Sequence, residues 1–397
     1  MKQDVISEHT PAAVFLIFLR LGLTSFGGPI AHLGYFRDEF VTRRKWISEQ
    51  SYSDIIALCQ FLPGPASSQV GIALGLSQAG YSGALAAWAG FTLPSAILLI
   101  LFAQGISSYG KLVPPGALHG LKVVAVAVVA QAVWGMMRNL CPDATRVTIM
   151  AVATCVLLLF PGALSQLGVI GVAAIIGLFI CQPGHNERHE PLNIPVRPRT
   201  GAFWLTLFLI LLAGLPILAA IYPNHTLVMV EAFYRTGSLV FGGGHVVLPL
   251  LQAEVVPTGW VSNETFLAGY AAAQAVPGPL FTFAAFLGAS MNPFPSGWEG
   301  GILCLLAIFA PSFLLVTGTL PFWDLVKENI RIRAALSGIN AAVVGLLLAA
   351  LYNPVWTSAI HTPQDFCLGL LALVSLTSWR LPPWLVVMCG GFVGGMI

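Results

Sequence analysis

Charged side chains are scarce in this sequence. Asp, Glu, Lys and Arg make up 9% of the 397 residues, while hydrophobic residues make up 57%. A water-soluble domain contains about 25% charged residues, so this chain has too few to cover a surface that faces water. The formal net charge is only +2, which gives no indication of nucleic-acid binding, and we expect no nucleic acid as a partner.

Several chemical motifs are missing as well. The seven cysteines form no CxxC pair and lie mostly in apolar runs, so we expect packed thiols rather than a disulfide framework. No Gly-x-x-x-x-Gly-Lys-Ser/Thr motif occurs, which excludes an ATPase motor of that kind. His185 and His189 have the spacing of metal ligands, but their polar surroundings favour a solvated loop, and we expect no metal or cofactor. The N-terminus lacks the pattern of a signal peptide.

Long apolar segments take up much of the chain. They lie at residues 92–104, 123–137, 147–160, 169–181, 203–220, 336–351 and 366–376. A helix needs about 20 predominantly apolar residues to cross a bilayer, and runs this frequent are typical of membrane helices. The sequence therefore predicts an all-α polytopic membrane protein surrounded by lipid.

The second half of the chain repeats motifs of the first. RLGLTSFGG, which starts at Arg20, matches RTGSLVFGG, which starts at Arg235. Further matches follow in the same order: Trp-x-Ser at 46–48 and 260–262, Gln60 and Gln274, Pro-Gly-Pro at 63–65 and 277–279, and Pro-Ser at 94–95 and 311–312. We interpret the chain as two homologous repeats, residues 11–182 and 226–397. Residues 183–225 join them through a polar cytoplasmic linker and one unmatched transmembrane helix.

The unmatched helix predicts that the two repeats have inverted topology. If each repeat crosses the membrane an even number of times, one added crossing turns the second repeat upside down. Cytoplasmic loops collect Lys and Arg. Residues 34–50 hold four Lys or Arg side chains, whereas their counterpart, residues 250–264, holds none. Residues 136–146 hold two, and their counterpart, residues 353–364, holds none. In the third pair the difference is reversed, because residues 106–115 hold one and residues 324–333 hold three. This alternation predicts a cytoplasmic N-terminus and an outside C-terminus.

Glycine and proline clusters interrupt the apolar segments at matched places. If loop 34–50 is cytoplasmic, residues 11–40 must enter and leave on the same side and turn near Gly27-Gly28-Pro29. Residues 52–78 would likewise turn near Pro63-Gly64-Pro65. Proline cannot continue the helix before it and fits the first turn of the next one. We therefore favour discontinuous or re-entrant helices over ordinary crossings that are kinked by Gly and Pro.

Such turns are suited to binding an anion. Non-helical backbone at membrane depth is tolerated where it lines a cavity, and a helix N-terminus presents free N–H groups and a positive dipole end. Matched turns would converge near the bilayer midplane, as in secondary transporters. The candidate contacts are Ser25, Gly27, Gly28, Pro29, Gln60, Pro63, Gly64, Pro65, Ser67 and Ser68, with Gly242, Gly243, Gly244, His245, Gln274, Pro277, Gly278, Pro279 and Thr282. A helix–helix hydrogen bond is the alternative for Gln60 and Gln274, and simple packing for His245.

Two arginines lie inside apolar segments. An arginine at a helix centre in a membrane costs at least about 2.5–3.5 kcal/mol, so it usually faces a cavity or a partner. Arg235 has Glu231 four residues before it, whereas Arg20 has Leu16 at that place. We predict that Arg20 faces the anion, that Arg235 is partly neutralised, and that Glu231 couples transport to protons. The alternative is that both arginines extend to the lipid headgroups.

These duplicated blocks resemble the chromate ion transporter family. They read RLGLTSFGGPIAHLGYFRDEF with QFLPGPASSQ, and RTGSLVFGGGHVVLPLLQAEV with QAVPGPLFTF. The resemblance covers nearly the whole chain, as in long, fused members of that family. It implies a protein of the bacterial cytoplasmic (inner) membrane that exports chromate, confers chromate resistance and also recognises sulfate. Gly244 stands where the first half has Pro29, which puts an equivalent role there in doubt.

Two other classes of protein share some of these features. A permease for sulfate or another inorganic or organic anion would have the same turns and charges. A membrane redox enzyme with haem would need paired histidines inside helices, and neither His119 nor His245 has an evident partner in the sequence. We therefore expect a transporter and not an enzyme. The sequence leaves the coupling ion and the oligomeric state open, a homo-oligomer included.

Overall fold

The computed structural model describes residues 10–109, 115–181, 196–241, 244–323 and 329–396, and these residues form helices and no strands. The helices of the first half are α1 (Pro11–Thr24), α2 (Gly28–Phe36), a π-helix (Arg37–Arg43), α3 (Glu49–Phe61), α4 (Ala66–Tyr109), α5 (Pro115–Leu140), α6 (Ala144–Leu159) and α7 (Ala163–Ile180). The backbone of α4 leaves helical geometry at Ala79 and Gly80, so α4 is two helices joined at a sharp bend.

The second half follows the same order of elements. After α8 (Pro198–Ile221) come α9 (His225–Leu239), a 3-10 turn (Gly244–Val246), α10 (Val247–Val255), α11 (Asn263–Ala275), a 3-10 turn (Leu280–Thr282), α12 (Phe283–Ser290), α13 (Gly297–Thr319), a 3-10 turn (Leu320–Phe322), α15 (Ile330–Ala350), a π-helix (Leu351–Trp356), α16 (Pro363–Thr377) and α17 (Pro383–Met396). The two parts of α4 correspond to α12 and α13. The helix without a counterpart is α8.

Matched residues begin matched helices. Ser48 caps α3, where its hydroxyl accepts a hydrogen bond from the Ser51 amide, and Ser262 caps α11 by accepting one from the Thr265 amide. A capping serine satisfies one of the free N–H groups at a helix start. The Trp-x-Ser motif of the sequence therefore marks the entry into the third helix of each half.

The helices break where the glycine and proline clusters lie. The helix α1 ends at Thr24 and α2 begins at Gly28, with a left-handed backbone at Gly27 (φ 104°) that glycine adopts without strain. Similarly, α3 ends at Phe61 and α4 begins at Ala66, with φ 125° at Gly64. Both segments of the first half are thus discontinuous helices at the predicted positions.

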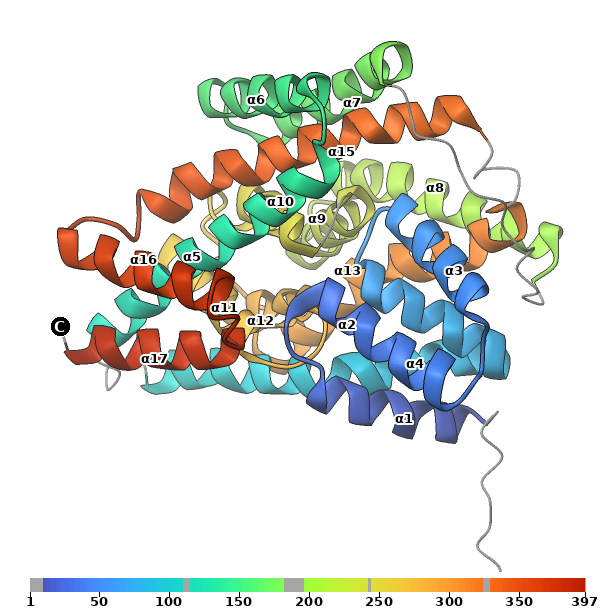
Figure 1. Cartoon of the computed structure of the whole chain (residues 1–397), viewed down its shortest axis with the longest axis horizontal. Helices are drawn as coiled ribbons and strands as arrows, with labels where there is room; N and C mark the ends of the chain where they lie inside the picture. Colours follow the sequence, from blue (N-terminus) through green and yellow to red (C-terminus); the bar gives the residue numbers. More distant parts are fainter. Residues whose placement is uncertain (1–9, 110–114, 182–195, 242–243, 324–328, 397) are drawn as a thin grey trace, which may run out of the picture.

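The last two helices of each half pack on the other half. The helices α6 and α7 contact α15, and α16 and α17 contact α5; Figure 1 shows α6 and α7 side by side, next to α15. The helices α5 and α17 approach each other closely because glycines recur four residues apart in both, at Gly116 and Gly120 and at Gly390 and Gly394. A Cβ atom at Gly120 would lie against the Gly390 carbonyl oxygen. The sequence boundaries 11–182 and 226–397 therefore do not delimit separate packing units.

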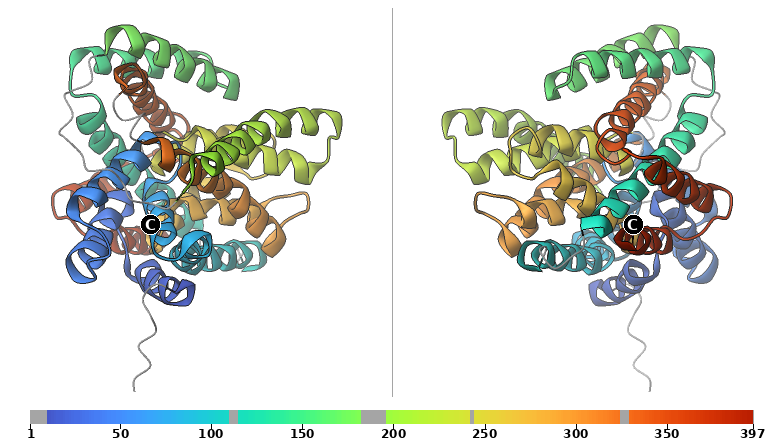
Figure 2. Two further views of the ribbon diagram at one scale, coloured as in Figure 1. Left: turned by 90° about the vertical axis from the view of Figure 1, so that its right-hand side faces the viewer. Right: turned by 90° about the vertical axis from the view of Figure 1, so that its left-hand side faces the viewer.

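The unmatched helix α8 packs on α9 and α13. In Figure 2 the α8–α9 pair projects from one side of the molecule. Of the α8 residues only Gly201 and Phe208 are buried in the isolated chain, and large apolar side chains such as Phe203, Leu209 and Ile217 are about three-fifths exposed (59–61%). This exposed face is suited to lipid.

Five helical segments are long and apolar enough to cross a membrane. They are Ala66–Ser107, Gly116–Leu140, Pro198–Ile221, Gly297–Phe322 and Ile330–Trp356. Six shorter apolar helices accompany them, among them Pro11–Thr24 and Pro383–Met396. The described residues thus have the composition and helix lengths of a polytopic membrane protein.

Candidate functional site

Residues from both halves line one central cavity of about 950 Å³. This volume is in the range of small-molecule sites, about 300–1,000 Å³. The first half contributes the break between α1 and α2, the break between α3 and α4, and one face of α5. The second half contributes Gly244, His245, Gln274, Asn340 and the turn between α16 and α17.

Two reciprocal backbone hydrogen bonds hold the helix breaks of the two halves together. The Gly64 amide donates to the Val240 carbonyl oxygen (2.7 Å), and the Gly278 amide donates to the Ser25 carbonyl oxygen (3.0 Å). Gly64 and Gly278 are matched in the sequence alignment, and so are Ser25 and Val240. Such an exchange of equivalent contacts is the signature of a two-fold relation. The breaks of the two halves therefore meet across an approximate two-fold axis.

Three helices begin at the cavity wall. The lining includes Gly28 at the start of α2, Ala66 at the start of α4 and Pro383 at the start of α17. The first amides of a helix have no acceptor within the helix, and each N-terminus carries about half a positive elementary charge. Taken together, the three helix starts make the cavity attractive to an anion.

Uncharged polar side chains also line the cavity. Gln60 is exposed to it, and the buried Gln274 amide nitrogen makes no hydrogen bond to the described part of the chain, although it lies near the Tyr270 hydroxyl. The His245 ring nitrogen Nδ1 lies 2.9 Å from the same hydroxyl. The exposed Gln60 amide can therefore donate to a ligand oxygen in the cavity, whereas the Gln274 nitrogen is itself buried beside Tyr270.

Five polar lining residues were not predicted from the sequence: Tyr35, Gln131, Asn139, Asn340 and Arg380. Gln131 donates from Nε2 to the Leu376 carbonyl oxygen (3.3 Å), which ties α5 to the end of α16. Arg380 is the one charged side chain among the lining residues of this cavity in the described chain. Gln131, Asn139 and Arg380 lie outside the duplicated motifs, so the sequence comparison of the two halves could not have marked them, whereas Tyr35 lies inside the block that starts at Arg20.

The remaining predicted contacts lie near the cavity but do not line it. Ser67, within 3.4 Å of His32 Nδ1, and Ser68 are both 2% exposed. The Thr282 hydroxyl donates to the Pro279 carbonyl oxygen inside its own turn. Neither Ser25 nor any of Pro63, Pro65, Pro277, Gly278 and Pro279 is part of the lining, and Gly242 and Gly243 lie outside the described residues. These residues shape the breaks rather than face the cavity.

Arg20, predicted to face the anion, lies elsewhere. It lines a separate pocket of about 240 Å³ with Asp38, Glu39 and Arg43. Burial opposes ionisation of Glu39, but hydrogen bonds from Arg44 (2.6 Å) and Arg43 (2.9 Å) outweigh it and lower the pKa of that carboxyl. Arg20 therefore shares its pocket with two acidic side chains and one further arginine, because the segment after α2 lies beside α1. Arg20 is thus not among the residues that line the larger cavity.

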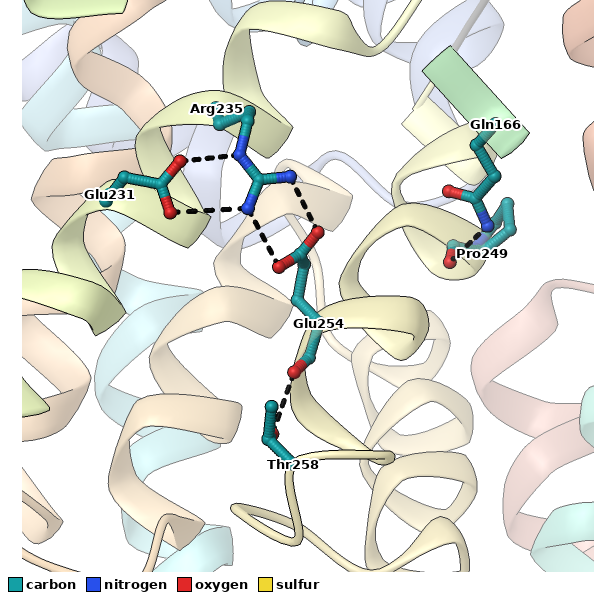
Figure 3. Close-up of polar contacts among 6 residues, drawn as sticks. All are labelled: Gln166, Glu231, Arg235, Pro249, Glu254 and Thr258. Atoms are coloured by element: carbon teal, nitrogen blue, oxygen red, sulfur yellow. Dashed lines mark hydrogen bonds and ion pairs between the residues drawn. The ribbon is translucent and has the colours of Figure 1, made fainter. Parts of the chain in front are cut away.

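Arg235 pairs with Glu231 as predicted, and with a second carboxylate that the sequence did not reveal. Its guanidinium donates to both Glu231 oxygens (2.5 and 3.2 Å) and to both Glu254 oxygens (2.8 and 3.0 Å), as Figure 3 shows. The two carboxylate side chains are 9% and 16% exposed. The cluster has one cation and two carboxylates, so it carries a formal charge of −1 when both are ionised.

Comparison with known proteins agrees with this architecture. The family model described as "Chromate transporter" matches residues 12–178 and again residues 227–395. The chain belongs to the chromate transporter family. The interval between the two matched parts contains α8, the helix without a counterpart.

Relatives of full and of half length are known. The chain is 27% identical to the probable chromate transport protein of Synechococcus elongatus, covering 95% of this chain and 93% of that protein. It is also 27% identical to the chromate transport protein of Pseudomonas aeruginosa, covering 99% and 95%. An uncharacterized transporter of Bacillus subtilis is 28% identical and covers only 42% of this chain but 93% of its own length. No solved structure matches the chain.

Proposed function

We propose that this protein is a secondary transporter that exports chromate through the central cavity, from the cytoplasm across the bacterial cytoplasmic membrane. The observation that carries the proposal is the meeting of three helix N-termini and one arginine at a cavity with no acidic lining residue in the described chain. Family membership and two full-length relatives named for chromate transport support the substrate. Sulfate is a dianion of the same shape and would bind to the same groups.

The charge pattern supports an inverted topology with the cavity open to the cytoplasm. Three loops border the cavity: the basic segment 37–45, the turn at 141–143, and the turn between α16 and α17. The lining residues Tyr35, Asn139 and Leu140 lie directly before the first two, and Arg380 lies in the third. Lys and Arg residues in the first of these loops, and Arg138 and Arg146 on either side of the second, favour a cytoplasmic position for both by the positive-inside rule. No described residue of loops 250–264 and 353–364, which are predicted outside, lines the cavity.

A fourth pair of turns follows the same alternation. The α16–α17 turn contains Arg380, while the matching α6–α7 turn, residues 160–162, contains no basic residue. In an inverted arrangement the first of these is cytoplasmic and the second outside. An anion in the cytoplasm would therefore reach the cavity directly, as export requires.

Export needs no motor of its own. One charge moved through 100 mV is worth about 2.3 kcal/mol, so a dianion that leaves a negative interior gains about 4.6 kcal/mol. The same gain applies to sulfate, so selectivity or coupling must limit its loss. We propose Glu231 as the coupling group, because the cluster with Arg235 and Glu254 has one carboxylate more than its cation balances.

Inside-out membrane vesicles test the function, since their outer face is the cytoplasmic one. Vesicles that contain the protein should take up chromate faster than vesicles without it, and a lumen-positive potential should accelerate the uptake. Sulfate in excess should slow it. Absence of protein-dependent chromate flux under either sign of potential would refute the proposal, and sulfate uptake without chromate uptake would replace it with a sulfate permease.

A further inference from the structure

The turn between α16 and α17 places a cation where the cavity opens. Arg380 is exposed, lines the cavity, and makes no ion pair or hydrogen bond within the described chain. By contrast Arg37, Arg43, Arg44, Arg146 and Arg235 all pair with carboxylates. The charge of Arg380 is therefore available to an anion in the cavity.

The backbone at Arg380 is unusual for a side chain of this size. Its φ is +53°, in the left-handed region that favours glycine. The amide after it closes the end of α16, because Leu381 N–H donates to the Ser375 carbonyl oxygen (3.0 Å). Glycine or asparagine would end the helix at this position with less strain. Arginine here carries a charge that helix termination does not require.

Neighbouring groups make the position suited to an oxyanion. Arg380 is followed by Leu381, Pro382 and Pro383, all of which line the cavity, and Pro383 begins α17. The guanidinium and the positive end of α17 thus come from adjacent residues. A guanidinium presents several N–H donors in a plane and can bind two oxygens of one oxyanion.

We propose that Arg380 is the residue that binds the transported oxyanion at the cytoplasmic mouth of the cavity. The inference rests on the proposed transport function and adds to it the group that supplies the charge. It assigns to Arg380 the role that the sequence suggested for Arg20. Without Arg380 the cavity retains its amides and helix ends but has no charged lining residue among those described.

The structure offers substitutions that remove the charge and keep the turn. Arg380→Gly and Arg380→Asn both suit a positive φ. Lys45 provides the matched control, because it is also a basic residue with positive φ (54°) at the end of a helical segment, and it does not line the cavity. Lys45→Asn therefore removes one charge in a similar backbone setting outside the site.

The experiment measures the half-saturating chromate concentration for uptake by proteoliposomes, with protein yield and thermal stability in detergent. Arg380→Gly and Arg380→Asn should raise this concentration about tenfold or more, which corresponds to about 1.4 kcal/mol, without any loss of stability. Arg380→Lys should recover part of the loss, and Lys45→Asn should transport like the unsubstituted protein.

Three results are contrary to the inference. Unchanged half-saturation in both uncharged variants would show that Arg380 does not meet the anion. A loss of affinity in Lys45→Asn equal to that in Arg380→Asn would show that the removal of any basic charge, and not of Arg380 in particular, weakens binding. A fall in stability or yield with unchanged half-saturation would assign Arg380 a structural role at the end of α16. No chromate flux in the unsubstituted protein would instead refute the transport function itself.

Discussion

Gly64 lies directly against Ser312 of the other half, so that a Cβ at Gly64 would be 2.7 Å from the Ser312 hydroxyl oxygen. The matched residues have the reciprocal contact: a Cβ at Gly278 would be 2.8 Å from the Ser95 hydroxyl oxygen. Ser95 and Ser312 belong to the duplicated Pro-Ser motif. The Pro-Gly-Pro breaks are thus the points at which the two halves cross, and their glycines allow that close approach.

Replacing either glycine by alanine should destabilise the protein by a similar amount. Both have positive φ, 125° at Gly64 and 100° at Gly278, and a sparsely populated backbone conformation costs about 1–3 kcal/mol; the close hydroxyl adds to this. Thermal unfolding in detergent measures the effect. Gly105→Ala is the control, because no atom lies within 4 Å of its Cβ position. A loss in only one of the two variants would contradict the equivalence of the crossings.

The Arg235 cluster should be sensitive to the loss of its cation. Arg235→Gln leaves Glu231 and Glu254 facing each other without compensation, at a cost of roughly 3–5 kcal/mol for a buried pair that loses one partner. Glu231→Gln should be milder, since Arg235 still binds Glu254 through two hydrogen bonds.

Combined substitutions separate this ion-pair effect from a packing effect. The double variant Glu231→Gln with Arg235→Gln should recover part of the loss, and adding Glu254→Gln should recover more, because coupled groups are not additive. Yield and thermal stability are the measurements. If each added substitution lowers stability further, the cluster is not held by its charges.

The topology predicts which side each loop faces. In a variant without native cysteines, Lys45→Cys should react with an impermeant maleimide only in inside-out vesicles, and Thr258→Cys only in whole cells. Asn139→Cys, in the cavity wall, should behave like position 45 if the cavity opens to the cytoplasm as proposed. Labelling of positions 45 and 258 from the same side of the membrane would overturn the inverted arrangement.

The helix breaks could be predicted from the sequence because their cause is local. Clusters of proline and glycine end the helix before them; α2 begins within the Gly27-Gly28-Pro29 cluster, and α4 begins directly after Pro63-Gly64-Pro65. The ion pair of Arg235 with Glu231 was predictable for the same reason, since residues four apart in a helix are neighbours.

The long-range contacts could not be predicted in this way. Glu254 reaches Arg235 only because α10 packs on α9, and Arg20 meets Asp38 and Glu39 only because the segment after α2 lies beside α1. Arg380 comes to the cavity because α16 and α17 pack on α5 of the other half. The small residues four apart in α5 and α17 indicate close helix contacts, but their spacing does not identify the partner.

The central claim is that the cavity between the two helix breaks is where chromate binds. The most direct measurement is the half-saturating chromate concentration for uptake by inside-out vesicles with Gln60→Leu or Gln274→Leu, both in the cavity wall. Each substitution removes a hydrogen-bond donor to the anion. The half-saturating concentration should therefore rise about 5- to 10-fold, since a hydrogen bond is worth about 1 kcal/mol or more to a charged group. Gln104→Leu, which removes the same group from α4 outside the lining, should leave it unchanged. Equal half-saturation in all three variants and the unsubstituted protein would contradict the account.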